Sequence, residues 1–335
     1  MRLALFFVAV FAGCSSPAIH EPIRPLRDYR GIIHCHSKFS HDSQGTYEEI
    51  LAAAKAAKVD FICMTDHPPS GDKGLPLREG WTGIHDGVLF IQGAEYSDQI
   101  LGLGLKEPIS GKDRRETIQA IHAQGGVAIA CHPEEIDDWD AYAEADGMEI
   151  YNVHATLKRK SKDKAFLVEV VKKIKEDPEH SFQLLQDLDP AIVKKYDDQA
   201  RLRGGAFTAI AGNDAHQNVR PFGLQLDPYP RAFKFVSTHV LASELSQEAV
   251  LKALKTQRAY VAFDILRPVR LGAGDPPADT EGVTSRIAVL DQEPLDSEGP
   301  GRFETRIPQR QEWWLPKEGG RLPWVLFPYR GFGWP

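Results

Sequence analysis

Apolar runs alternate with amphipathic or Ala-rich stretches along most of this chain, and this order predicts strands and helices in turn. We expect strands at 31–36, 59–65, 88–94, 100–105, 127–131, 148–151, 207–211 and 235–241. We expect helices at 46–58, 113–124, 162–175, 190–203 and 246–256, the first with Thr46 as N-cap and Glu48 and Glu49 in its first turn. The strands are continuous apolar runs, so they predict a parallel α/β sheet that is buried on both faces.

The composition changes near residue 272. Residues 272–302 are rich in Gly, Pro, Asp and Glu and predict a linker or loop, whereas the last 23 residues hold four of the six Trp residues. We interpret this last part as an extended segment of one or two strands whose aromatic rings pack on the main domain. The expected organisation is a leader at 1–22, a main domain at 23–270 and a short irregular extension at 271–335.

The leader has the pattern of an export signal. Arg2 precedes an apolar stretch at 3–13, which is too short to span a bilayer and has the length of the hydrophobic region of a secretory signal. It ends in FAGC (residues 11–14), which resembles a bacterial lipobox with Phe in place of the usual Leu. We expect an exported bacterial lipoprotein, periplasmic or associated with the outer membrane, that is held to the membrane by a lipid on Cys14. An ordinary signal peptide and an uncleaved hydrophobic start are the alternatives.

Charge and cysteine content narrow the classes of function. With 40 basic and 47 acidic residues the net charge is −7, so there is no bulk positive field for nucleic acid, and none is expected as a partner. The odd number of cysteines beyond the leader argues against a disulfide framework. We interpret Cys35, Cys63 and Cys131 as small buried apolar residues, and leave a metal-ligand role for Cys131 open.

Imidazole and carboxylate side chains follow several predicted strands. His34 and His36 are two apart on one strand, so both project to one face and Cys35 to the other, and Asp214 and His216 repeat this spacing. Such side chains hold borderline and hard divalent metals, and the carboxyl ends of strands carry the active sites of barrels and open α/β folds. The pattern predicts a polynuclear metal site in a hydrolase.

The pair Asp66 and His67 follows the second predicted strand. Neighbours in an extended strand cannot face the same way, so we assign His67 to the metal and a capping or supporting role to Asp66. Any single histidine is more often a hydrogen-bonded core residue than a ligand. The number of such clusters, all at strand ends, favours the metal.

Six ordered motifs resemble the polymerase and histidinol phosphatase (PHP) family: HCHSKFSHDS (34–43), MTDH (64–67), GAEYS (93–97), CHP (131–133), EIYN (149–152) and GNDAH (212–216). The resemblance covers about residues 28–262. It implies a distorted (β/α)7, TIM-like barrel with two or three divalent ions, Mn, Fe or Zn, that hydrolyses phosphoesters. Carried over by motif, one ion is held by His34, His36, Glu95 and Asp214. A second is held by Asp42, His67 and His216, and Glu95 bridges to a further site with His132.

Two points of this ligand set depend on the chain's own residues. Within SHDS we prefer Asp42 to His41, because neighbouring residues rarely supply two ligands. Many members of the family have another histidine where this chain has Gln99, and a glutamine carbonyl is a weaker ligand for a transition metal. We therefore expect two ions and leave the third open. His154 could replace the missing histidine as a ligand of the third ion, but we prefer to interpret it as a supporting or substrate-facing residue.

The expected reaction is hydrolysis of small phosphomonoesters or nucleotides by a metal-bridging hydroxide. Candidate substrate contacts are Lys38, Arg78, His154 and Arg220, and Lys158 and Arg159 lie in predicted loops beside the motifs. One alternative is a metal-dependent amidohydrolase or deacetylase, since the same nucleophile attacks carbonyls. Another is a metal-binding surface lipoprotein without catalysis.

Overall fold

The computed structural model describes residues 26–68, 80–109, 113–186, 188–220 and 225–264, and the strands at 285–289, 295–297, 310–314 and 324–328. The expected leader, Cys14 and Arg78 lie outside these residues. Within the described part, every helix is too short or too polar to cross a membrane.

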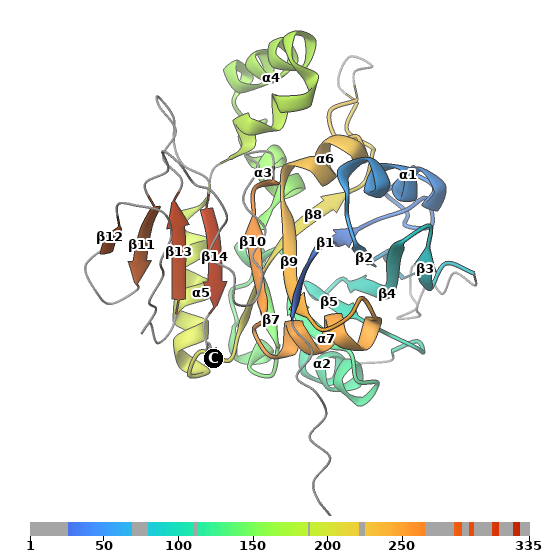
Figure 1. Cartoon of the computed structure of the whole chain (residues 1–335), viewed down its shortest axis with the longest axis vertical. Coiled ribbons are helices and arrows are strands. Elements are labelled where there is room, and N and C mark those ends of the chain that lie inside the picture. Colours follow the sequence, from blue (N-terminus) through green and yellow to red (C-terminus); the bar gives the residue numbers. More distant parts are fainter. Residues whose placement is uncertain are drawn as a thin grey trace, which may run out of the picture.

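Seven strands close into a barrel, because the last of them pairs back to the first (Figure 1). In barrel order they are β1 (Arg27–Cys35), β2 (Phe61–Met64), β4 (Val88–Tyr96), β5 (Ile100–Leu103), β6 (Val127–Ala130), β7 (Gly147–Asn152) and β8 (Thr208–Ala215). The short strand β3 (Gly83–His85) pairs with β4. The TIM-like α/β barrel that the resemblance implied is confirmed.

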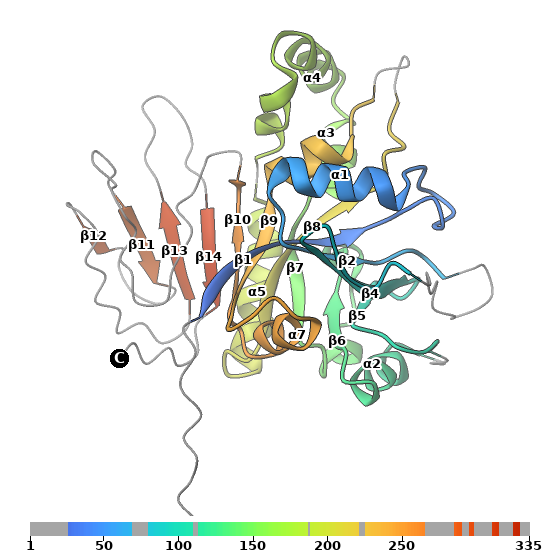
Figure 2. The same ribbon diagram turned by 45° about the vertical axis from the view of Figure 1, so that its right-hand side comes forward.

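Helices surround this barrel (Figure 2). They are α1 (Tyr47–Ala57), α2 (Arg114–Ala123), α3 (Val153–Lys160), α4 (Lys164–Glu176), α5 (Pro190–Leu202), α6 (Tyr229–Phe235) and α7 (Gln247–Lys255), with short 3₁₀ turns at η1 (Pro133–Glu135), η2 (Asp140–Tyr142) and η3 (Pro178–Leu185). The predicted cap of α1 is confirmed, since Thr46 and Glu49 form a capping box. Helices α3 and α6 were not predicted, and Lys158 and Arg159 lie on α3 rather than in a loop.

One barrel strand runs against the others, which corrects the expectation of a parallel sheet. Strand β5 is antiparallel to both β4 and β6, while the remaining barrel pairs are parallel. Only residues 97–99 separate β4 from β5. A parallel connection needs a crossover of about a dozen residues, so this short loop can make only a hairpin.

The barrel strands are buried on both faces, as their continuous apolar runs predict. Ile33, Cys63 and Ile91 belong to one buried cluster, which also includes Val250 and Leu254 of α7. Helix α7 thereby closes the barrel end at which the parallel strands begin. The adjacent strand residues belong to a second cluster with the surrounding helices. The three described cysteines are free and fully buried, as expected.

A second set of strands extends the sheet beyond the barrel. The first half of β1 pairs antiparallel with β9 (Ser237–Ala242), which continues through β10 (Ala259–Ala262), β14 (Trp324–Pro328), β13 (Arg310–Trp314), β11 (Ser285–Val289) and β12 (Leu295–Ser297). Strands β13 and β14 agree with the extended segment predicted at the C-terminal end. Strands β11 and β12 correct the prediction of a linker at 272–302.

A buried polar network lies where β1 leaves the barrel for this second set. The two ring nitrogens of His239 lie 2.8 Å from Asp28 Oδ1 and 3.2 Å from Asp264 Oδ1. Arg30 lies 3.1 Å from the second oxygen of Asp264, and the Tyr260 hydroxyl donates to Asp28. Burial by itself lowers the pKa of His239, yet the hydrogen bonds to Asp264 and Asp28 raise it to about 9. The imidazole is therefore held in its charged form.

This network predicts that stability depends on pH. In the unfolded chain His239 titrates near 6.5, and in the folded protein near 9. The contribution of His239 to the free energy of unfolding amounts to about 3 kcal/mol. It is fully present below about pH 6.5 and is lost as the pH rises to about 9. We expect the free energy of unfolding in urea to fall over this range, and to fall less in His239→Gln. Equal slopes for the two proteins would contradict a charged His239.

Candidate metal centre

The end of β1 carries a β-bulge that directs two histidines to one side. Ile33 belongs to the cluster inside the barrel, so strict alternation would turn His34 outward. Instead the pairing with β2 and β8 shifts between Ile33 and Cys35, and His34 has a left-handed φ of 66°. Cys35 then joins the outer cluster, while His34 and His36 share the inner side. The common face predicted for the two histidines is present, through a bulge that the sequence pattern did not reveal.

The first group of potential ligands consists of His34, His36, Glu95 and Asp214. Glu95 Oε2 lies 2.9 Å from His34 Nε2 and 3.1 Å from His36 Nε2. Asp214 Oδ1 lies 3.2 Å and 3.4 Å from the same two nitrogens. These side chains come from the ends of β1, β4 and β8. Because the barrel is closed, the ends of these three strands face the same interior.

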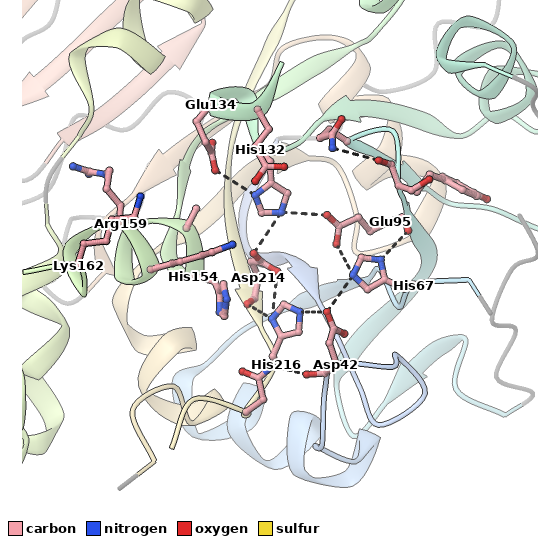
Figure 3. Close-up of a pocket in the computed structure, with 17 residues that line it drawn as sticks. Asp42, His67, Glu95, His132, Glu134, His154, Arg159, Lys162, Asp214 and His216 are labelled. Carbon is pink, nitrogen blue, oxygen red and sulfur yellow. Dashed lines mark hydrogen bonds and ion pairs between the residues drawn. The ribbon is translucent and has the colours of Figure 1, made fainter. Parts of the chain in front are cut away.

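The second group consists of His36, Asp42, His67 and His216. Asp42 Oδ2 lies 3.1 Å from His216 Nε2 and 3.3 Å from His67 Nε2. Figure 3 shows Asp42 between these two rings. Asp42, which we preferred in the sequence, lies in this group, whereas His41 does not. His36 belongs to both groups, so the two potential sites are adjacent.

A third group joins Glu95 to Cys131 and His132. Glu95 Oε1 lies 3.2 Å from His132 Nε2 and accepts a hydrogen bond of 3.6 Å from the Cys131 thiol. The two oxygens of Glu95 therefore face different groups, as in a bridging carboxylate. The side-chain amide of Gln99 donates to the Ser97 carbonyl.

Glu149 supports these groups from behind, and sequence reasoning gave it no role. Its fully buried carboxylate accepts from His34 Nδ1 at 2.6 Å, from the His132 amide at 3.0 Å and from the Asn152 side chain at 3.1 Å. Hydrogen bonds of this kind fix the ring orientation and tautomer of a ligand histidine. A Cβ on Gly212 would lie 1.9 Å from Glu149 Oε1, so glycine leaves the space for this carboxylate. The available signal was a carboxylate inside an otherwise apolar strand.

Asp66 lies outside the three groups and caps the loop after β1. It accepts from the Ser37 amide at 2.5 Å and from the Ser37 hydroxyl at 2.8 Å. These bonds fix the start of the segment that carries Asp42.

The charges of the site demand positive partners. Burial raises the pKa of Glu95 and Asp214, but the surrounding imidazoles hold both well below their usual values. Burial lowers the pKa of His34, but Glu95, Asp214 and Glu149 raise it well above its usual value. Protons thus balance the carboxylates in the ion-free protein, and a divalent ion would displace them.

Two buried polar atoms of this site make no well-directed hydrogen bond and test whether a metal fits. His36 Nε2 and Asp214 Oδ1 lie 3.4 Å apart and within ion-pair distance of Glu95 and His34, yet neither forms a hydrogen bond of normal geometry. Such atoms are rare because burial without a partner is costly. Imidazole nitrogen and carboxylate oxygen are the donors that Mn, Fe and Zn accept, so the residues fit a divalent ion.

A cavity of about 480 Å³ opens above the three groups. Its wall includes His154, Lys158 and Arg159 of α3, and Lys162 beyond it. Figure 3 shows Arg159 and Lys162 at one side of the cavity and His67 at the other. The sequence candidates Lys38 and Arg220 are not among the lining residues. The lining residues are Asp42, His67, Glu95, Tyr96, Ser97, Gln99, His132, Glu134, Glu135, His154, Ala155, Lys158, Arg159, Lys162, Asp214, His216 and Asn218.

His154 contacts the cavity without joining a ligand group. Its ring lies 5.0 Å from that of His216, and its buried Nδ1 atom has no hydrogen-bond partner. Burial lowers the pKa of His154, so the imidazole is neutral at neutral pH. This position agrees with a substrate-facing residue.

The contacts of Glu149 predict its effect on metal binding. In Glu149→Gln the amide cannot accept all the hydrogen bonds that orient His34 and His132. We expect the affinity for Zn²⁺ or Mn²⁺ to fall about 10- to 100-fold, measured by competition with a chelator. Glu144→Gln is the control, because this surface carboxylate contacts only Gln119 among the hydrogen bonds of the described residues. Unchanged affinity in Glu149→Gln would exclude the supporting role.

The sequence matches the PHP domain family over residues 33–210. It is 30% identical over 143 residues to the uncharacterized protein MJ1587 of Methanocaldococcus jannaschii, covering 36% of this chain and 81% of that protein. Among solved structures, a two-domain protein from Bacteroides vulgatus that contains a predicted PHP-like metal-dependent phosphoesterase is similar at 15% identity and a TM-score of 0.44. That match covers 92% of this chain and 88% of the other.

Endonuclease Q, in complex with a 27-mer duplex substrate that has an abasic lesion at the active site, is similar at 14% identity and a TM-score of 0.36. The match covers 69% of this chain and 56% of that protein. The family match and the ligand groups together support a metal-dependent hydrolase. Because the match spans more than half of its length, the chain belongs to the PHP domain family.

Proposed function

We propose that the protein is a metal-dependent phosphoesterase that acts on small phosphomonoesters, nucleotides included. One observation carries this proposal: the first and second ligand groups share His36, the first and third share Glu95, and residues of all three groups line a single cavity. Shared ligands place two ions close enough to act on one phosphoryl group. The residues that would hold them are His34, His36, Asp42, His67, Glu95, Asp214 and His216, with His132 beside a third position.

When bound, the ions would polarise the phosphoryl oxygens and supply a water of lowered pKa as nucleophile. The chain's own residues do the rest. Glu149 orients His34, and Asp66 positions the loop that carries Asp42. The neutral ring of His154 offers one N–H donor and one acceptor nitrogen to a substrate in the cavity.

The α3 side of the cavity favours an anionic substrate. Lys158 and Lys162 both line it, and within the described residues neither ammonium group is paired with a carboxylate. Arg159 lines the same wall. A phosphate that bridges the floor and this wall would meet fixed positive charge, which an amide substrate would not require.

Substrate panels separate this proposal from its rivals. Hydrolysis of aryl amides but not aryl phosphates would indicate the amidohydrolase, and bound metal without turnover would indicate a binding protein. A DNA duplex with an abasic site belongs in the same panel, because Endonuclease Q has such a substrate. Cleavage of that duplex would overturn the expectation that no nucleic acid is bound.

Metal content is the direct test of the centre. We expect about two to three equivalents of Mn, Fe or Zn per chain by elemental analysis, and loss of phosphatase activity when a chelator removes them. His36→Ala removes a ligand common to two groups, so the metal content should fall by at least about one equivalent and the activity by at least about 100-fold. The control His122→Ala changes a partly exposed histidine that pairs with Asp146. Full metal content in His36→Ala would refute the assignment.

The basic side chains of α3 predict that removing one of them weakens substrate binding. Lys158→Met should raise KM for a phosphomonoester about tenfold with little change in kcat, because one charged contact to the bound phosphate is lost. Lys160→Met is the matched control on the same helix, since Lys160 lies over the Phe166 ring and outside the cavity lining. An equal effect of the two substitutions would show that Lys158 does not contact substrate.

A further inference from the structure

Cys131 and His132 are neighbours in the chain, yet both side chains reach the same carboxylate. Neighbours in an extended strand point to opposite faces. His132 follows β6 with a left-handed φ of 46°, which breaks the alternation. Its backbone amide donates to Glu149, which holds this conformation in place. The backbone thus removes the obstacle to two consecutive ligands.

Two of the three separations within this triad match the edges of a tetrahedral zinc site, and all three ligand atoms lie within 4.8 Å of one another. With a Zn–S bond of about 2.3 Å and Zn–N and Zn–O bonds of about 2.0 Å, tetrahedral angles place S and O about 3.5 Å apart, and N and O about 3.3 Å apart. The observed separations are 3.6 Å between Cys131 Sγ and Glu95 Oε1, and 3.2 Å between His132 Nε2 and the same oxygen.

A further buried carboxylate borders this triad. Asp214 Oδ2 lies 3.6 Å from His132 Nε2, while the other oxygen of Asp214 faces the first group, 3.2 Å from His34 Nε2. On the opposite side of the ring, Glu134 lies 3.5 Å from His132 Nδ1 and can orient it. Gln99 lines the cavity nearby but offers only an amide.

We propose that Cys131 supplies a thiolate ligand to a third ion, which Glu95 and His132 hold beside the two-ion centre. The inference rests on the metal centre of the proposed function. Coordination replaces the S–H proton, which is released to solvent. A soft thiolate favours Zn²⁺ over Mn²⁺ or Mg²⁺, so this position would be the zinc-selective one. Three protein ligands leave a fourth position open, as in catalytic rather than structural zinc sites.

Cobalt substitution tests the thiolate without reference to turnover. The metal-free full chain is titrated with Co²⁺, and its absorption is compared with that of Cys131→Ser. We expect a sulfur-to-cobalt charge-transfer band in the near ultraviolet that is absent from Cys131→Ser, together with the loss of one bound equivalent. A variant with Cys14→Ser, Cys35→Ala and Cys63→Ala, which retains Cys131 as its single thiol, should keep both the band and the equivalent.

The outcomes separate the two proposals. Bound cobalt without a thiolate band in the wild type, or a band that persists in Cys131→Ser, would overturn the role of Cys131 and leave the two-ion centre intact. Cys131 would then be a hydrogen-bond donor to Glu95. Failure to bind any cobalt would overturn the metal centre itself. If Cys131→Ser does not fold, the band in the single-thiol variant still decides the question.

Discussion

The buried carboxylate of Glu95 is the group on which the metal centre depends. One of its oxygens lies within 3.5 Å of nitrogens of His34, His36 and His67, and the other faces His132. Burying a carboxylate is costly unless positive partners surround it. This requirement explains why imidazoles from separate strands converge here. It is also the property that would attract divalent ions, since each ion replaces protons that the imidazoles now hold.

The convergence of these side chains requires strained backbone conformations. His34, His132 and Asp214 all have left-handed φ angles, at the ends of β1, β6 and β8. For residues other than glycine, each such conformation costs about 1–3 kcal/mol and persists only where the surroundings enforce it. Glu149 does so for two of these positions, through the His34 ring and the His132 amide. Part of the backbone strain of the described residues therefore lies at the functional edge of the barrel.

Two kinds of secondary-structure element supply the side chains that line the cavity. Strand ends form its floor of carboxylates and imidazoles, whose positions the barrel holds rigidly. Helix α3 forms a basic wall. This short helix begins directly after β7, where the Asn152 side chain caps its N-terminus. The groups that would bind metal ions and the groups that would bind an anionic substrate therefore lie on different sides of one cavity. A single small substrate can reach both. Helix α7 packs against the interior cluster at the opposite end of the barrel.

The sequence by itself determined the order of most strands and helices, the cap at Thr46 and the shared side of His34 and His36. These features follow from local periodicity and turn chemistry, which neighbouring residues encode. The direction of β5 was also encoded in a short loop, but continuous apolar runs concealed it. Helix α3 escaped notice because its buried stripe, Val153, Thr156 and Leu157, covers little more than one turn of a short polar segment.

The periodicity of the chain did not show which ligands meet; the motif resemblance named the groups, and the tertiary structure brings their members together. Pairing of β8 with β1 brings Asp214 to His34, and no local pattern records that closure. The supporting role of Glu149 and the approach of Cys131 to Glu95 depend on bulges and left-handed turns at strand ends. Such departures from alternation are stabilised by contacts between distant segments, so they are absent from the chain's periodicity and arise only when the barrel is formed.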